Sequence, residues 1–252
     1  MLYRQLAKYY NYVYYWKNYK KDVFVIKKII RRYNKSGGNE LLEIGCGTGN
    51  YLKYLSKNFS CTGTDVSASM LSIAKHKLNG VRLIKSDMAE MHLGKRFDVV
   101  LCLWGVMSYA KTYSALEKTI KNFSEHLKPG GVLIADPWYT TSNGNSGTKA
   151  YYRAGFPYMT TYNGKNLKIA RVRIPINRGE RQIMDIHTLV ARKGSKHVEY
   201  FIDRYDVGLF KISKVLGIMK RFGIKAKFVK DSIGNGAYIG VKTLTARPGL
   251  RN

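Results

Sequence analysis

The sequence has little cysteine, and its three thiols are widely separated. Cys46, Cys61 and Cys102 include no C-x-x-C pair and leave an odd count. A disulfide-bonded scaffold and a cysteine zinc site both need paired or clustered cysteines. The sequence therefore argues against those two classes, predicts no metal site, and favours the reducing environment of the cytoplasm.

Long apolar runs are also missing. The longest, VVLCLWGVM at 99–107, is far shorter than the roughly 20 residues that a membrane-spanning helix needs. The first residues, MLYRQLAKYYNYVYYW, contain no apolar stretch of the kind found in a secretory signal. We therefore expect a soluble, cytoplasmic protein that makes no membrane contact.

Acidic residues are scarce, since 16 Asp and Glu stand against 44 Lys and Arg, and the net charge is +28. A field of this sign attracts polyanions such as RNA, nucleotide-sugars and anionic membrane surfaces. A solvated basic surface that binds no ligand would have the same net charge. This alternative fits because the charges are spread along the chain and no dedicated nucleic-acid module accompanies them. The charge alone does not decide the function.

What the sequence does contain is a regular alternation of strands and helices. Its length of 252 residues, with 45% apolar content, suits one globular domain. Apolar strand-like runs occur at 40–45, 61–65, 81–88, 97–104 and 130–138, and helix-like segments at 20–33, 50–59, 67–78 and 113–127. Ser67 is the expected N-cap of the third of these helices. This alternation predicts a parallel, doubly wound sheet with right-handed crossovers.

The pattern changes after residue 140. Three runs that alternate apolar with polar residues, at 167–176, 181–191 and 196–207, predict antiparallel strands with one exposed face. A helix at 211–223 and a strand pair at 224–231 and 237–243 follow. We therefore predict one domain over 1–252, with a β-rich insertion or cap at 141–207.

A glycine-rich turn joins the first predicted strand to the first helix that follows it. In Glu43-Ile44-Gly45-Cys46-Gly47-Thr48-Gly49 the glycines let the backbone approach a ligand, and the helix N-terminus offers free N–H groups. The third glycine comes one residue too early for the dinucleotide motif G-x-G-x-x-G. The second strand ends in Asp65, whose carboxylate can accept hydrogen bonds from ribose hydroxyls, and Ser86-Asp87-Met88 follows the third strand.

This ordered set of motifs resembles that of the class I S-adenosylmethionine-dependent methyltransferases, over nearly the whole chain. The resemblance implies S-adenosylmethionine as cofactor and a Rossmann-like, seven-stranded doubly wound sheet whose last strand is antiparallel, with a three-stranded antiparallel insertion after strand five. It implies that Gly45, Gly47 and Gly49 wrap the methionine part near Glu43, that Asp65 holds the ribose, and that Asp87 and Met88 contact the adenine. The remaining cofactor contacts that it implies come from Cys46, Val66, Leu103 and Tyr10.

The sequence is also similar in layout to the amino-sugar N,N-dimethyltransferases of the desosamine and mycaminose type. The similarity rests on YYNYVYYWKNYKKD (9–22), LCLWGVMSYA (101–110), DPWY (136–139), the insertion and the C-terminal helix and strand pair. It implies a small-molecule acceptor, which a sugar or nucleotide-linked compound would satisfy, and an N-terminal helical lid at 1–36 that carries Tyr3, Tyr10 and Tyr19. The chain departs from that group in having Tyr109 where the group has a histidine, and Asp136-Pro137-Trp138-Tyr139 in place of E-P-W-W.

Methyl transfer from a sulfonium is an in-line displacement, which asks the protein mainly for alignment. The candidates for a base are Tyr109 and His187, with Asp136 as a third; packing under a lid explains Tyr109 equally well, and a solvated strand position explains His187. We predict that Tyr3, Tyr19, Asp136, Trp138 and Tyr139 contact the acceptor. DPWY differs by one letter from the D-P-P-Y motif of base-modifying methyltransferases, but that motif follows strand four, whereas DPWY follows strand five, so this likeness is accidental.

Three functions remain open from the sequence. The favoured one is methyl transfer to a nitrogen or oxygen of a small molecule, whose phosphates, if present, would meet the basic surface. The second is methyl transfer to RNA or protein, since tyrosines interleaved with lysines can also stack on bases. The third is cofactor binding without turnover. The oligomeric state is also open, with a homodimer among the options.

Overall fold

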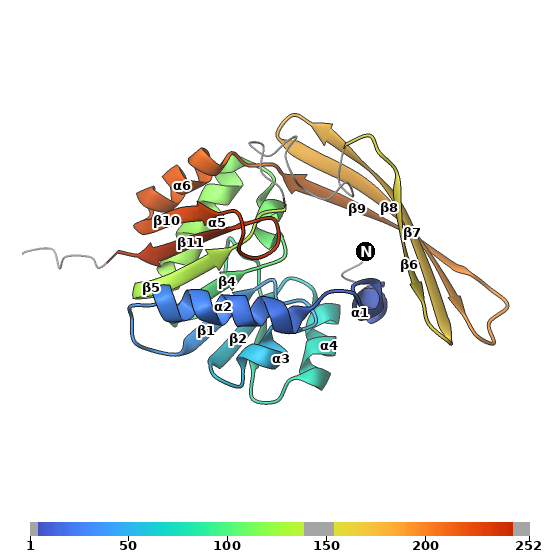
Figure 1. Ribbon diagram of the computed structural model, residues 1–252, viewed down its shortest axis with the longest axis horizontal. Helices are drawn as coiled ribbons and strands as arrows, with labels where there is room; N and C mark the ends of the chain where they lie inside the picture. The colour runs from blue at the N-terminus through green and yellow to red at the C-terminus, as the bar shows by residue number, and fades with distance from the viewer. Residues whose placement is uncertain (1–4, 139–153, 244–252) are drawn as a thin grey trace, which may run out of the picture.

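A computed structural model describes residues 5–138 and 154–243 and arranges them around two sheets (Figure 1). The larger sheet has the strand order β10-β11-β5-β4-β1-β2-β3. Its strands are β1 (Glu40–Ile44), β2 (Ser60–Asp65), β3 (Arg82–Lys85), β4 (Phe97–Cys102), β5 (Leu127–Ala135), β10 (Ile224–Val229) and β11 (Ala237–Lys242). β11 is antiparallel to both of its neighbours, and the other neighbouring strands are parallel. This arrangement confirms the predicted seven-stranded sheet with an antiparallel last strand.

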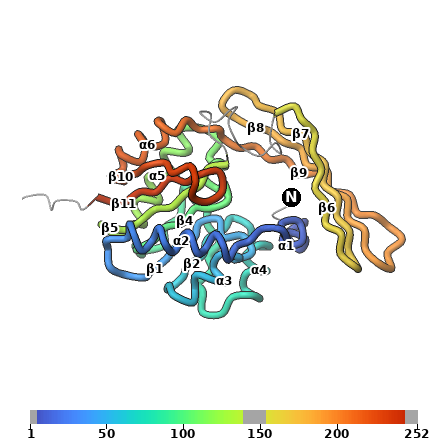
Figure 2. The backbone as a smooth tube through the Cα atoms, viewed as in Figure 1, coloured from blue at the N-terminus to red at the C-terminus, as the bar shows by residue number. Residues whose placement is uncertain are grey.

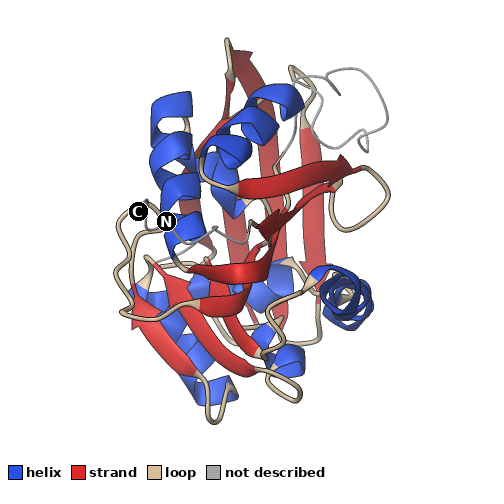
Figure 3. Cartoon of the chain, turned by 90° about the vertical axis from the view of Figure 1, so that its left-hand side faces the viewer, coloured by secondary structure: helices blue, strands red, loops and turns tan. Residues whose placement is uncertain are grey.

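The sheet is covered by helices on both faces, as the view in Figure 3 shows. Successive residues of a strand point to opposite faces, so Leu41 of β1 joins one core and Leu42 joins the other. The first core contains side chains of α2 (Tyr19–Tyr33), α3 (Leu52–Leu55) and α4 (Ala68–Lys77). The second contains side chains of α5 (Tyr113–Glu125) and α6 (Ile212–Arg221). Burial on both faces explains the continuous apolar run of β4.

Polar caps fix where three of these helices begin. The side chains of Asn18, Ser67 and Thr112 each accept a hydrogen bond from a backbone N–H of the first turn of α2, α4 and α5. The predicted cap at Ser67 is thereby confirmed. The predicted helix at 50–59 is shorter than expected, because only α3 is regular helix and the residues around it form turns.

The insertion is a separate antiparallel sheet in the order β6-β7-β8-β9, formed by β6 (Tyr158–Asn163), β7 (Leu167–Arg178), β8 (Arg181–Arg192) and β9 (Glu199–Gly208). It has four strands, one more than the sequence predicted. β6 was missed because Gly, Asn, Thr and Ser around it resemble a loop, although its burial alternates along the strand. The predicted insertion begins at residue 141, and its first part lies outside the described residues.

The N-terminal segment lies between the two sheets (Figure 2). It contains a 3-10 turn, η1 (Ala7–Tyr9), and α1 (Tyr10–Val13). Its buried side chains share a third core with Ile169, Met184 and Ile186 of the insertion. The segment therefore connects the insertion to the rest of the domain. None of the helices in the described ranges is long and apolar enough to cross a membrane.

Candidate active site

The glycine-rich turn begins where β1 ends, at the carboxyl edge of the large sheet. Gly45, Gly47 and Gly49 all have positive φ angles, of 67°, 54° and 71°. Only glycine adopts this region at low cost. The Cys46 N–H donates to the Thr64 carbonyl (2.9 Å), and the Gly47 N–H donates to Oδ2 of Asp65 (2.9 Å). The turn is therefore fixed to the end of β2.

Asp65 serves two backbone donors at once, because its Oδ1 accepts a second hydrogen bond from the Ser67 N–H (2.8 Å). Burial raises the pKa of Asp65, and the hydrogen bonds from Ser67 and Gly47 oppose that rise. Each carboxylate oxygen has a further lone pair. Asp65 can therefore support the turn and still accept from the hydroxyls of a bound ribose.

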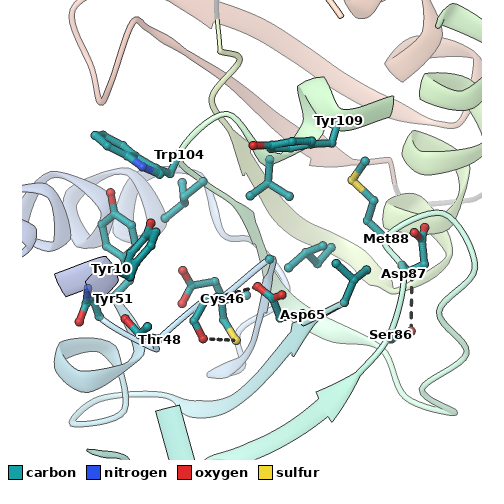
Figure 4. Close-up of a pocket in the computed structure, with 18 of the residues that line it drawn as sticks. Tyr10, Cys46, Thr48, Tyr51, Asp65, Ser86, Asp87, Met88, Trp104 and Tyr109 are labelled. Atoms are coloured by element: carbon teal, nitrogen blue, oxygen red, sulfur yellow. Dashed lines mark hydrogen bonds between the residues drawn. The ribbon is translucent and has the colours of Figure 1, made fainter. Parts of the chain in front are cut away.

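A cavity of about 230 Å³ opens beside the turn and Asp65 (Figure 4). It brings together ten of the eleven residues that the sequence predicted as cofactor contacts: Tyr10, Glu43, Gly45, Cys46, Gly47, Asp65, Val66, Asp87, Met88 and Leu103. In Figure 4, Asp87 and Met88 stand at one end of the cavity, and Tyr10 and Thr48 at the other. The cavity is therefore elongated between the side of β3 and the side of the N-terminal segment.

Gly49 is the exception, since it does not line the cavity. A Cβ atom there would lie 2.6 Å from Cδ1 of Leu78, so the glycine allows the turn to pack against α4. The third glycine of the motif thus has a packing role.

Glu43 lines the cavity and is almost completely buried, and its Oε2 has no hydrogen-bond partner among the described residues. Burial and then the nearby Asp65 raise its pKa well above the usual range. A buried carboxyl without a partner is costly. A donor or cation within the cavity would lower that cost, and the α-ammonium group of S-adenosylmethionine is such a cation.

Comparison with known proteins agrees with this geometry. Residues 41–131 match the model of a family described as "Methyltransferase domain". The chain is 27% identical to a dTDP-3-amino-3,4,6-trideoxy-alpha-D-glucopyranose N,N-dimethyltransferase of Streptomyces venezuelae, over 89% of this chain and 92% of that one. It is also 27% identical to a dTDP-3-amino-3,6-dideoxy-alpha-D-glucopyranose N,N-dimethyltransferase of Streptomyces fradiae, with 89% and 85% covered.

Solved structures of sugar methyltransferases are similar to this chain as well. The sugar N-methyltransferase KedS8 from Streptoalloteichus sp ATCC 53650 superimposes with a TM-score of 0.80 at 25% identity, covering 90% of this chain and 89% of that one. Streptomyces venezuelae DesVI superimposes with a TM-score of 0.80 at 27% identity, covering 90% and 93%. The chain is an S-adenosylmethionine-dependent methyltransferase.

Aromatic side chains close the other side of the methyltransferase's cavity, and the sequence predicted only some of them. Tyr10, Tyr19 and Tyr109 were predicted, and all three line the cavity. Tyr51 and Trp104 line it as well and were not predicted. Tyr51 belongs to the predicted helix at 50–59 and Trp104 to the segment at 101–110, but nothing in their spacing distinguished them from core residues.

Lys17 lies among these rings. Its Nζ is 3.6 Å from the centroid of the Trp104 ring, and the Tyr19 and Tyr51 rings are 5.4 and 5.6 Å away. The ammonium also pairs with Asp22 (2.8 Å), which accepts a hydrogen bond from the Tyr51 hydroxyl (2.9 Å). This buried cation fixes the position of three rings of the cavity wall.

Asp136 supports the cavity wall through Trp104 and does not itself line the cavity. The residue is buried, is not among those that line the cavity, and accepts a hydrogen bond from the Trp104 N–H at 2.6 Å. Burial raises the pKa of Asp136 to about 7, and Lys17 opposes the rise. Trp104 has a φ of 65°, which is costly for a bulky side chain. Asp136 thus holds a strained backbone in place.

Trp138 and His187 do not line the cavity. The backbone N–H of Trp138 donates to Oγ of Ser108 (3.0 Å). The Trp138 ring is 5.9 Å from the ring of Tyr205, on the inner face of the insertion. His187 is exposed on the outer face of β8, where its Nδ1 is 2.6 Å from the Tyr200 hydroxyl oxygen. The structure therefore does not bring His187 to the reaction, because β8 turns its neighbours Ile186 and Thr188 inward. Tyr3 and Tyr139 lie outside the described residues.

No group of three or more His, Cys, Asp or Glu side chains in the described ranges could hold a metal ion. The three cysteines are buried and unpaired thiols. Burial and then Glu43 raise the pKa of Cys46 well above its usual range, so this cavity thiol is kept neutral.

Proposed function

We propose that this methyltransferase transfers methyl groups to the amine of a nucleotide-linked amino sugar. One observation carries the proposal: the similarity to dTDP-amino-sugar N,N-dimethyltransferases extends through the insertion and the C-terminal elements and is not limited to the cofactor-binding half. The cofactor half alone would be shared with methyltransferases of many substrates. The insertion lies next to the aromatic side of the cavity, where the ring of its Tyr205 is 6.2 Å from that of Tyr109.

The residues of the cavity fit S-adenosylmethionine, which supplies an electrophilic methyl group when bound. In the proposed arrangement Asp65 accepts from the ribose hydroxyls, Asp87 and Met88 contact the adenine, and Glu43 faces the α-ammonium group. Gly45 and Gly47 allow the methionine part to approach the backbone. The unpartnered Oε2 of Glu43 supports this assignment, because a cationic group would satisfy it.

The chain's main contribution to catalysis is alignment and exclusion of water. An amine is nucleophilic when neutral, so the site must hold it unprotonated and in line with the methyl group. In our proposal the N-terminal segment and the insertion cover the acceptor as a lid and a cap, and Tyr10, Tyr19 and Trp104 exclude water. Tyr109 is the one predicted base candidate that lines the cavity, so we assign it the contact with the acceptor amine.

A methyl-transfer assay tests the proposal. Purified protein is incubated with S-adenosylmethionine labelled in its methyl group and with dTDP-linked 3-amino-sugars, and products are separated by mass. The expected result is label in a low-mass product that carries one or two added methyl groups. The same sugars without an amino group are the matched control and should stay unlabelled.

The two other functions give different results in the same assay. Label that becomes RNase-sensitive with total RNA as acceptor would support RNA methylation, which the net charge of +28 favours. Tight binding of S-adenosylhomocysteine with no labelled product from any fraction would indicate a cofactor-binding protein. Either result would contradict the proposed acceptor.

A further inference from the structure

The inner face of the insertion sheet buries two arginines. Arg171 and Arg173 alternate with exposed residues along β7, and their side chains point toward the body of the protein. Arg171 is only 1% exposed and Arg173 only 7%. Buried arginines are rare and are normally paired with an acid or with several acceptors.

Arg171 lacks such partners. Among the residues that the structure describes, none of its three side-chain nitrogens has a hydrogen-bond partner. Nε of Arg173 and Oγ1 of Thr188, which is paired with Arg171 across the strands, also have none. The arrangement presents several buried hydrogen-bond donors at one place, and no carboxylate of the described residues receives a hydrogen bond from them.

Two tyrosines stand beside the guanidinium. Burial alone would lower the pKa of Arg171, but the neighbouring Tyr14 and Tyr205 phenols raise it above its usual value. Both phenols are polar but neutral groups, so they do not balance the charge of the guanidinium. The guanidinium is therefore held charged inside the protein.

One acid, Asp203, lies on the same face as the two arginines. Asp203 of β9 lies in the cross-strand row of Arg173, with Ile186 of β8 between them. Neighbouring strands are about 4.8 Å apart, so the two backbones are separated by two such steps. Neither arginine forms an ion pair with an acid within the described part of the chain.

The arginine is one layer of rings away from the cavity. The Tyr14 ring, whose centroid is 5.8 Å from Cζ of Arg171, is 5.7 Å from the ring of Trp104, which lines the cavity. On the other side, the Tyr205 ring is 6.2 Å from that of Tyr109, which also lines it. Tyr14 and Tyr205 therefore stand between the guanidinium and the place where methyl transfer would occur.

We infer that Arg171 binds an anionic group of the methyl acceptor, with Arg173, Thr188 and the Tyr14 and Tyr205 hydroxyls as further donors. A phosphate or diphosphate fits this set, because a guanidinium recognises phosphate oxygens in pairs. The identification of the anion as a diphosphate rests on the proposed function. An anion that enters from the cavity side requires the Tyr14 and Tyr205 rings to move aside, and their hydroxyls can donate to the same anion.

A binding experiment with two Arg171 variants tests the inference. Calorimetry measures the affinity of dTDP, and separately of inorganic pyrophosphate, for the full chain saturated with S-adenosylhomocysteine. The wild-type protein should bind dTDP, Arg171→Met should weaken the binding at least tenfold, and Arg171→Lys should fall between them. Arg204→Met is the matched control, because Arg204 lies on the exposed outer face of the same sheet, and it should leave the affinity unchanged.

Thermal unfolding of the ligand-free variants separates a binding role from a structural one. Removal of a buried charge without a partner should leave the Tm of Arg171→Met equal to that of the wild type or raise it. The inference is overturned if the wild type does not bind dTDP or if Arg171→Met binds it equally well. It is also overturned if both Arg171 variants lose S-adenosylhomocysteine affinity together with Tm, since that pattern shows a structural role.

These experiments distinguish failure of the anion site from failure of the proposed function. Arg171-dependent dTDP binding without methylation of any amino sugar would support the anion site and reject the amino-sugar acceptor. Methylation of a dTDP-linked amino sugar with an unchanged kcat/KM in Arg171→Met would support the acceptor and reject the site.

Discussion

At the scale of single residues, Asp65 combines two tasks that a substitution can separate. Asp65→Asn keeps the size of the side chain but replaces one acceptor oxygen by a donor, which cannot receive the N–H of Gly47 or Ser67. Loss of charge-assisted hydrogen bonds of about 1.5–3 kcal/mol predicts a 10- to 100-fold weaker affinity for S-adenosylhomocysteine in calorimetry. Glu90→Gln, an exposed carboxyl after β3, is the control and should bind as the wild type does. Unchanged affinity in Asp65→Asn would remove Asp65 from the cofactor site.

Asp136 makes a prediction about pH. Its folded pKa of about 7 lies above the usual value near 4, so the folded protein holds this proton more tightly than the unfolded chain does. The resulting contribution to stability is complete below about pH 4 and is lost as the pH rises through about 7, by at most about 4 kcal/mol. Asp136→Asn can still accept from the Trp104 N–H and does not ionise. We therefore expect the wild-type Tm to fall more between pH 5 and pH 8 than the Tm of Asp136→Asn. Parallel Tm curves would show that Asp136 does not titrate in this range.

The sequence predicted most of the cofactor contacts but not the residues that support the aromatic wall of the cavity. Asp65, Asp87 and the glycines follow predictable strand ends, and ten of the eleven predicted cofactor contacts line one cavity. Lys17, Trp104 and the support that Asp136 gives to Trp104 depend on contacts between segments far apart in the chain. Local patterns contain no information about such contacts.

At the scale of elements, the turn between β1 and α3 predicts two different outcomes for two similar glycines. Gly47→Ala places its Cβ in open space, so it should cost about 1 kcal/mol of backbone strain. Gly49→Ala adds a contact 2.6 Å from Leu78 to the same strain and should cost about 2–4 kcal/mol. Chemical unfolding measures the difference. Equal losses would contradict the packing role of Gly49.

The same elements explain which parts of the fold were predictable. The parallel strands are buried on both faces and produce long apolar runs that are hard to mistake. In the insertion, a period of two identifies a strand but does not say which face is buried. Ile186, His187 and Thr188 illustrate this, because the pattern alone allowed His187 to point inward, and the structure turns it outward. β6, with Thr and Asn in place of larger apolar residues, lacked even the pattern.

At the scale of the whole molecule, the net charge of +28 predicts how the acceptor arrives. A positive field raises the local concentration of an anionic acceptor, and salt screens that field with a Debye length of about 10 Å at 0.1 M. We therefore expect KM for a dTDP-linked amino sugar to rise several-fold between 50 and 500 mM NaCl, with kcat nearly constant, because alignment within the cavity does not depend on long-range attraction. The matched control is the same amino sugar without its nucleotide, supplied at a high concentration, whose KM should change little. If salt raises both KM values equally, or neither, the excess of lysine and arginine takes no part in acceptor binding, and the basic surface is only a solvated one.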